Sequence, residues 1–194
     1  MRRHPGRRVI AALALACAAT GSAALACGLE DPTSAATQRA VLALAYPQSP
    51  QVGTAVWQAQ LAGTLPRDPI AQRADLAPEA RAMMRHLRAN TLLRRFAGRL
   101  AAPDTAAADQ NLAVVLLGPA MWNRFETKDG RINPLLHVDG PEPGDVVVVT
   151  ELAVVEAIAV GSLGIAAALE IGVLRLYGAP ASVARARAWL TARG

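Results

Sequence analysis

The sequence predicts an α+β fold in which a mostly antiparallel sheet is covered by helices and preceded by N-terminal helices. The first part of the chain carries apolar residues at helical spacing. After Asn111 the period changes, and short apolar, β-branched runs alternate with turn residues. Helices then return and enclose one further strand. This order of helices, a strand meander, two helices, a strand and a helix is typical of the α+β class.

The first 26 residues are predicted to be an export signal. Four arginines, Arg2, Arg3, Arg7 and Arg8, precede the apolar run 9–19, and no acidic residue occurs before Glu30. Ala24-Leu25-Ala26 then offers small residues at both recognition positions of a cleavage site. The apolar run is shorter than the ~20 residues that a membrane span needs. We therefore expect an exported, periplasmic protein.

Cys27 follows the predicted cleavage site and leaves two alternatives open. A cysteine at this position resembles the acylated first residue of bacterial lipoproteins, which would anchor the protein to a membrane. The other interpretation is a plain exported protein with a cysteine near its new end. Cys17 lies inside the signal, so the mature chain 27–194 has one cysteine and cannot form an intramolecular disulfide.

The charge of the mature chain excludes general nucleic-acid binding. The whole chain has 20 basic and 15 acidic residues, and the signal contains four of the basic residues and none of the acidic ones. The mature chain therefore has 16 basic against 15 acidic residues, which is a net charge of +1. A strongly basic surface is the usual electrostatic mark of a nucleic-acid-binding domain, and this chain lacks it.

The mature chain divides into an N-terminal segment, 27–75, and an α+β domain, 76–194. In the segment, 35–46 and 51–65 are predicted to be helices separated by a Pro-containing turn. A longer helix is expected over 78–102, because Pro78 suits a first helical position.

The helix predicted over 78–102 is amphipathic. One side carries an arginine stripe: Arg81, Arg85, Arg88, Arg95 and Arg99. The other side carries Met83, Leu87, Leu93, Ala97 and Leu100. The stripe is interpreted as a solvated face, as a surface for anionic lipid head groups, or as a site for a partner protein.

Strands are predicted over 112–117, 121–127, 131–138 and 145–150. Asp129-Gly130 between the second and third runs predicts a hairpin. After the last run, Thr150 is predicted to cap a helix that ends at Gly161. A short helix over 163–171, a strand over 173–177 and a helix from Pro180 complete the chain. The apolar stretch 154–174 is not expected to span a membrane, because Glu156 and Glu170 lie inside it.

Reactive side chains are few, which favours binding over catalysis. His86 and His137 lie on different predicted elements, and no set of His, Cys, Asp or Glu has the spacing of metal ligands. Glu151 and Glu156 are poorly spaced for a paired acid and base, and solvated or capping roles are expected. The sequence therefore predicts neither a catalytic residue nor a metal or other cofactor.

The succession of elements between Asp145 and Leu190 follows a family pattern. A strand ending in a polar residue precedes a helix that ends at a glycine, and a short helix leads to Gly172-Val-Leu-Arg-Leu-Tyr-Gly178 and a closing helix. This succession resembles the C-terminal half of the sterol carrier protein 2 family of lipid-binding domains. The resemblance implies a five-stranded sheet covered by helices and enclosing an apolar tunnel.

The resemblance also implies a function, an exported, non-enzymatic lipid-binding or lipid-carrier protein. The lining residues that it suggests are Val114, Leu116, Leu136, Val147, Val149, Leu152, Val155, Ile158, Leu163 and Leu169. For any one of them taken alone, ordinary core is the favoured interpretation. The expected partners are an apolar lipid-like ligand and an anionic membrane surface or an envelope protein. The alternative is a structural or interaction module of the cell envelope with a filled core, for which Trp57, Trp122 and Trp189 are candidate anchors.

Overall fold

The computed structural model describes residues 35–100, 110–128 and 131–192. The export signal, Cys27 and Asp129-Gly130 lie outside these ranges, so the predictions made for them stay predictions. The helices are α1 (Ala35–Ala45), α2 (Ser49–Leu61), α3 (Pro78–Arg99), α4 (Leu152–Val160), α5 (Ile165–Glu170) and α6 (Pro180–Thr191). The strands are β1 (Leu112–Leu116), β2 (Met121–Lys128), β3 (Arg131–Val138), β4 (Val146–Thr150) and β5 (Arg175–Tyr177). The α+β class is confirmed.

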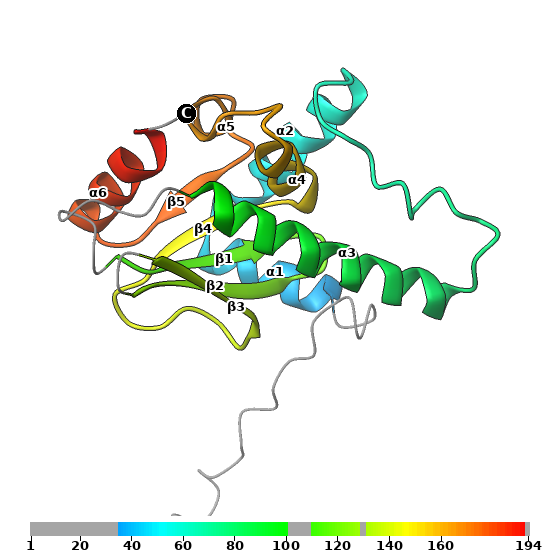
Figure 1. The fold of residues 1–194 in the computed structure, drawn as a ribbon, viewed down its shortest axis with the longest axis horizontal. Coiled ribbons are helices and arrows are strands. Elements are labelled where there is room, and N and C mark those ends of the chain that lie inside the picture. The colour runs from blue at the N-terminus through cyan, green and yellow to red at the C-terminus, as the bar shows by residue number, and fades with distance from the viewer. Residues whose placement is uncertain (1–34, 101–109, 129–130, 193–194) are drawn as a thin grey trace, which may run out of the picture.

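The five strands form one mixed sheet in the order β3-β2-β1-β4-β5. The prediction of a mostly antiparallel sheet is therefore corrected. The neighbouring strands β1 and β4 run parallel, with Leu112 opposite Val146 and Leu116 opposite Thr150. The physical reason is the connection 139–145, which leaves the edge strand β3 and returns along the sheet to start β4 beside β1 (Figure 1).

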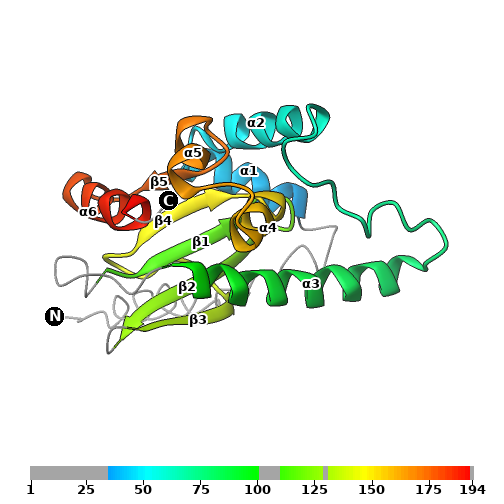
Figure 2. The same ribbon diagram turned by 45° about the horizontal axis from the view of Figure 1, so that its top comes forward.

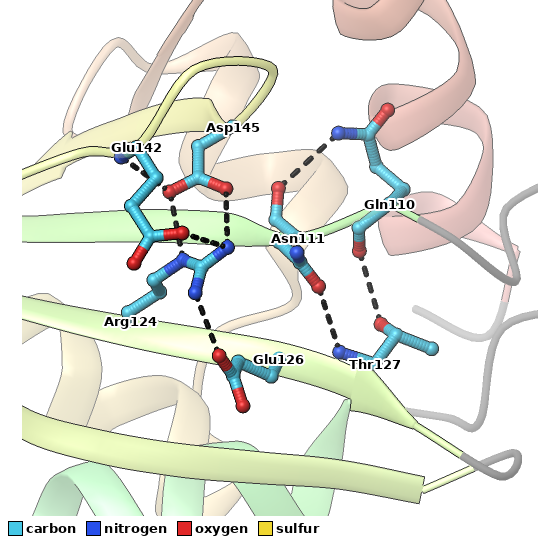
Figure 3. A network of polar contacts seen from close by, with 7 residues as sticks. All are labelled: Gln110, Asn111, Arg124, Glu126, Thr127, Glu142 and Asp145. Atoms are coloured by element: carbon cyan, nitrogen blue, oxygen red, sulfur yellow. Dashed lines mark hydrogen bonds and ion pairs between the residues drawn. The ribbon is translucent and has the colours of Figure 1, made fainter.

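Arg124 of β2 holds this connection in place. Its guanidinium donates to both carboxylate oxygens of Asp145, at 3.0 and 3.3 Å, and pairs with Glu126 and Glu142 at 2.6 and 2.9 Å (Figure 3). The Arg124 and Asp145 side chains are only 11% and 2% exposed. A buried carboxylate needs such a partner, because an unpaired buried charge is costly. The ion-pair cluster thus fixes where β4 begins.

Helices cover both faces of the sheet (Figure 2). Residues opposite one another on neighbouring strands point to the same face. The row Val114, Val148, Asn123 belongs to the face covered by α3, where Phe96 packs edge-on against Phe125 at 5.8 Å between ring centres. Both central strands are buried along their whole length, as expected for strands covered on two sides.

The N-terminal helices α1 and α2 cover the opposite face. Tyr46, just after α1, packs its ring against Trp122 of β2 at 6.0 Å and against Tyr177 of β5 at 5.0 Å. Val52 and Val56 of α2 are buried in the same core cluster as the sheet. The described part of 27–75 therefore packs on the α+β domain rather than standing apart from it.

The turn into α4 differs from the prediction. Thr150 is the last residue of β4, and its hydroxyl donates to the Val173 carbonyl at 3.0 Å instead of capping the helix. Glu151 takes the N-cap position, without a capping bond from its side chain. Gly161 ends α4 as predicted, in the left-handed conformation with φ 81° that glycine adopts without a steric penalty.

The long helix α3 is buried over one half only. Its C-terminal half carries Leu93, Phe96 and Ala97 into the core. Its N-terminal half projects beyond the sheet (Figure 1), where Met83 and Leu87 are 61% and 57% exposed. The predicted apolar side of this helix is thus buried in the core near its C-terminus and exposed to solvent near its N-terminus. Within the described ranges, no helix combines the length and the hydropathy that crossing a membrane requires.

Candidate functional site

A cleft of about 490 Å³ opens at the carboxyl ends of β1 and β4. After β1 the chain turns at Gly118 toward β2, and after β4 it turns at Glu151 into α4. Parallel neighbours whose connections leave in opposite directions create a crevice at their carboxyl ends, where ligands of open sheets commonly bind. The volume lies within the usual range for small-molecule sites, about 300–1,000 Å³.

The cleft wall comes from both helical layers. The N-terminal helices supply Arg39, Gly53, Val56, Trp57 and Gln60, and α3 supplies Ala82, Arg85, Arg88 and Ala89. The remaining wall is made by Pro66, Asp68, Gly118, Pro119, Glu151, Leu152, Ala153 and Glu156. Ten of these seventeen residues are apolar or glycine, so the cleft offers mainly apolar surface with a set of charged groups. Trp57 stands at the rim with 59% of its surface exposed.

Two ion pairs join elements across the cleft. Arg85 of α3 donates to Asp68 at 2.8 Å, and Asp68 also accepts from the Ile70 N–H at 2.9 Å. Arg88, one helical turn further on, pairs with Glu156 of α4. These four charges are therefore neutralised in pairs, and they tie α3 to the 62–77 connection and to α4.

Glu151 and Arg39 are arranged differently, since both bind Gly118. The Gly118 N–H donates to Glu151 Oε2 at 3.1 Å, and Arg39 Nη1 donates to the Gly118 carbonyl at 2.7 Å. Burial raises the pKa of Glu151 from its ordinary value of 4.5 to about 7, although the Gly118 bond and the Arg39 charge oppose the change. Glu151 therefore changes charge near neutral pH.

The structure does not bring the ten predicted lining residues together. Val114, Leu116 and Leu136 point to the α3 face of the sheet, whereas Val147 and Val149 point to the opposite face. The sheet lies between these two groups, so they cannot line one tunnel.

The exposed fractions of the ten predicted lining residues also show that most of them belong to the core. Val114, Leu116, Val149 and Val155 have no accessible surface, which makes them packed core. Ile158 is buried, and Leu136, Leu163 and Leu169 are partly buried against the core cluster. Only Leu152 of the ten lines the cleft.

The predicted arginine stripe of α3 is largely engaged within the protein. Arg85 and Arg88 form the ion pairs described above, and Arg99 donates to the Ala159 carbonyl at 3.1 Å, near the end of α4. Arg81 is half-buried, and Arg95 is exposed. The stripe therefore faces α4 and the cleft over most of its length, because α3 packs against α4 along this side.

His86 and His137 meet although they are far apart in sequence. His86 of α3 stacks on His137 of β3 with 4.4 Å between ring centres, and His137 Nε2 lies 2.9 Å from Asn90 Oδ1. His137 is the extra residue of a β-bulge and has a positive φ of 59°. The described residues contain no group of three or more His, Cys, Asp or Glu placed to hold a metal ion.

A second, more open hollow of about 680 Å³ lies along the 139–145 connection. The arginine in its wall, Arg124, is already surrounded by three carboxylates. A guanidinium with three carboxylate partners has few N–H groups left to bind a ligand. We therefore assign this hollow to the surface of the structural ion-pair cluster drawn in Figure 3 and not to a ligand site.

Comparisons with protein-family models, with curated proteins and with solved structures gave no match to this chain. The resemblance to the sterol carrier protein 2 family therefore stays a prediction. The assignment of the cleft as a candidate site is therefore based on its geometry alone.

Glu151 is one of the cleft residues, with Arg39, that were not predicted to belong to a site. A solvated or capping role was expected for it, but its side chain turns away from the helix end toward Gly118. The available signal was an acidic residue that follows a run of four valines with only Thr150 between them. That signal points to a site only when the strand has a parallel neighbour, and the parallel pairing of β1 and β4 was not predicted.

Proposed function

We propose that the protein is a non-enzymatic binding protein for lipid-like molecules and that its ligand occupies the cleft between α2, α3 and α4. The observation that carries this proposal is the mainly apolar cleft of about 490 Å³ at the carboxyl ends of β1 and β4. Transfer of an alkyl chain into such a site is favoured by ~0.8 kcal/mol for each buried CH₂.

The rim of the cleft supports an amphipathic ligand rather than a small polar one. Trp57, which lines the cleft, and Leu61, four residues further along α2, each expose more than half of their surface. Large exposed apolar side chains on a soluble domain commonly mark a site that another apolar surface covers. A bound chain would cover Trp57 in this way, while the charged groups of the cleft wall would meet the polar end.

The proposed setting is the bacterial cell envelope. It is supported by the predicted export signal 1–26 and by Cys27, which would anchor the protein to a membrane if it is acylated. Metabolic labelling with a fatty acid tests the anchor. Label that disappears in Cys27→Ala supports acylation, and the absence of label on the wild type contradicts it.

The binding proposal is tested by titrating the purified protein with the neutral apolar fluorophore N-phenyl-1-naphthylamine. Ala82 lines the cleft, whereas Ala80, two residues earlier on α3, is exposed and outside it. Ala82→Trp should fill the site and weaken probe binding by about tenfold or more, which is ~1.4 kcal/mol. Ala80→Trp should leave binding unchanged. Equal affinities in all three proteins, or no binding to the wild type, would contradict the proposal.

A second candidate function is an envelope interaction module, favoured by the exposed Met83 and Leu87 on the projecting half of α3. This function requires a partner that recognises the apolar patch rather than the cleft. Recovery of the same envelope protein with the wild type and with Ala82→Trp, but not with Met83→Ser/Leu87→Ser, would favour it. Recovery that is unaffected by the double substitution would count against it.

A further inference from the structure

The cleft contains two charged side chains that form no ion pair in the part of the chain that the structure describes. Arg85 and Arg88 are neutralised by Asp68 and Glu156. Glu151 accepts a hydrogen bond from a backbone N–H, and Arg39 donates to a backbone carbonyl. A carboxylate and a guanidinium are therefore left for a ligand.

The two groups stand side by side because Gly118 holds both. Glu151 binds its N–H and Arg39 its C=O, which fixes a negative and a positive group close to one residue. They do not approach within the 4.0 Å of an ion pair. A Cβ at position 118 would lie 3.1 Å from Glu151 Oε2, so glycine permits this close approach of the carboxylate. A ligand group can therefore enter between two opposite charges that do not cancel each other directly.

A positive ligand group fits the end of the site occupied by Glu151. Glu151 is half-buried and has no cation within ion-pair distance among the described residues, and a carboxylate that is partly removed from water without such a partner is costly to ionise. An ammonium group would supply the missing charge and donate hydrogen bonds to it. Trp57 lines the same cleft, and indole rings attract ammonium groups through their faces.

Arg39 is exposed, and its guanidinium attracts the opposite charge. An ammonium alone would leave the guanidinium without a counter-ion and would be repelled by it. An anionic group alone would bind Arg39 but would add a second negative charge beside Glu151. A head group that carries both charges satisfies both residues.

We propose that the cleft recognises a zwitterionic head group, with its ammonium on Glu151 and its anionic group on Arg39. This inference rests on the proposed function, in which the apolar part of the cleft holds the tail of the same molecule. The head-group chemistry is an ammonium close to a phosphate or a carboxylate. It could come from an amphiphile or from a soluble amino-phosphate, and the experiment separates the two sources.

The test is isothermal titration of the purified protein at about pH 8, where most of Glu151 is ionised. Three probes are compared: dihexanoyl phosphatidylethanolamine, dihexanoyl phosphatidylglycerol and free phosphoethanolamine. The first two have the same tails, and only the first carries an ammonium. We expect phosphatidylethanolamine to bind about tenfold more tightly than phosphatidylglycerol, as suits one charged hydrogen bond.

Glu151→Gln should remove this preference, because it retains the shape of the side chain without its charge. Glu170→Gln, on an exposed residue outside the cleft, is the matched control and should retain it. Equal binding of the two lipids to the wild type, or a preference that survives Glu151→Gln, would overturn the inference. Free phosphoethanolamine binding as tightly as its lipid would support head-group recognition with a soluble ligand as the source.

Failure of this inference can be told apart from failure of the proposed function. If N-phenyl-1-naphthylamine binds in the cleft but the two lipids bind equally, the proposed apolar site is supported and the proposed preference for a zwitterionic head group is wrong. If neither the probe nor any lipid binds, both are wrong.

Discussion

At the scale of single residues, Arg124 stabilises the connection 139–145 between β3 and β4. It is the counter-ion of Asp145, whose side chain is nearly completely buried at the start of β4. Arg124→Met should lower the free energy of unfolding by about 3–5 kcal/mol, because it leaves a buried carboxylate unpaired. Urea denaturation measures this loss.

Two further variants show whether the unpaired charge causes the loss at Arg124. Arg131→Met, on an exposed residue of the edge strand β3, should change stability by no more than about 0.5 kcal/mol. Adding Asp145→Asn to Arg124→Met should restore part of the lost stability. A double variant that is less stable than the single one would contradict this explanation.

Glu151 makes a pH-dependent contribution of its own. Its pKa is about 7 in the folded protein against an ordinary value of 4.5, so between these values the folded state binds more protons than the unfolded state. Stability must then fall as the pH rises from 4.5 to 7, by about 3 kcal/mol for a difference of ~2.5 units at 1.36 kcal/mol per unit. Below pH 4.5 this penalty is absent, and above pH 7 it is complete.

Comparison with Glu151→Gln isolates this contribution. The variant has no titrating group at the position, so the difference between the two unfolding free energies should change over pH 4.5–7 and be constant outside it. Parallel pH profiles for the wild type and the variant would show that Glu151 does not titrate as its burial implies.

At the scale of elements, the C-terminal half of α3 lies in the core and its N-terminal half is exposed. Phe96 is buried against Phe125, whereas Met83, about three turns earlier, is mostly exposed. Phe96→Ala should cost about 3–5 kcal/mol of unfolding free energy, because it leaves a cavity. Met83→Ala should change it by less than about 0.5 kcal/mol. Similar losses in urea denaturation would mean that the projecting half is packed in solution.

The elements themselves were mostly predictable because their signals are local. The first residues of α1 and α3, the hairpin strands and the end of α4 at Gly161 follow from apolar period and from Pro or Gly punctuation. The parallel pairing of β1 and β4 was not predictable in this way. It depends on a connection held by Arg124 and Asp145, which are separated in sequence and carry no local mark of their contact.

The site was less predictable than the fold for the same reason. Apolar periodicity identifies buried residues but does not tell which face of the sheet they occupy, and so Val114 and Val149 were assigned to one tunnel although they lie on opposite faces. The cleft is built instead from Arg39, Arg88 and Glu151, which come together only when α1, α3 and the end of β4 meet.

At the scale of the whole molecule, the N-terminal helices close the fold and also build the cleft. They cover the sheet face that carries Trp122 and Tyr177, and α1 and α2 supply Arg39 and Trp57 to the cleft wall. The boundary predicted between 27–75 and 76–194 therefore separates residues that share one core. A ligand in the cleft would contact both parts and stabilise their packing.

A chain reduced to 76–194 should consequently fail to fold cooperatively. Without α1 and α2, Val147, Val149 and the aromatic side chains of that face would be exposed as one apolar surface. We expect weak near-ultraviolet circular dichroism, strong binding of an anilinonaphthalene dye and a broad thermal transition, which together indicate a compact state without fixed packing. The matched control is a chain that begins at Cys27, which retains both helices and should unfold in a single sharp transition. A fragment 76–194 that unfolds as sharply as this control would show that the α+β domain is independent, and the N-terminal helices would then be needed for the cleft alone.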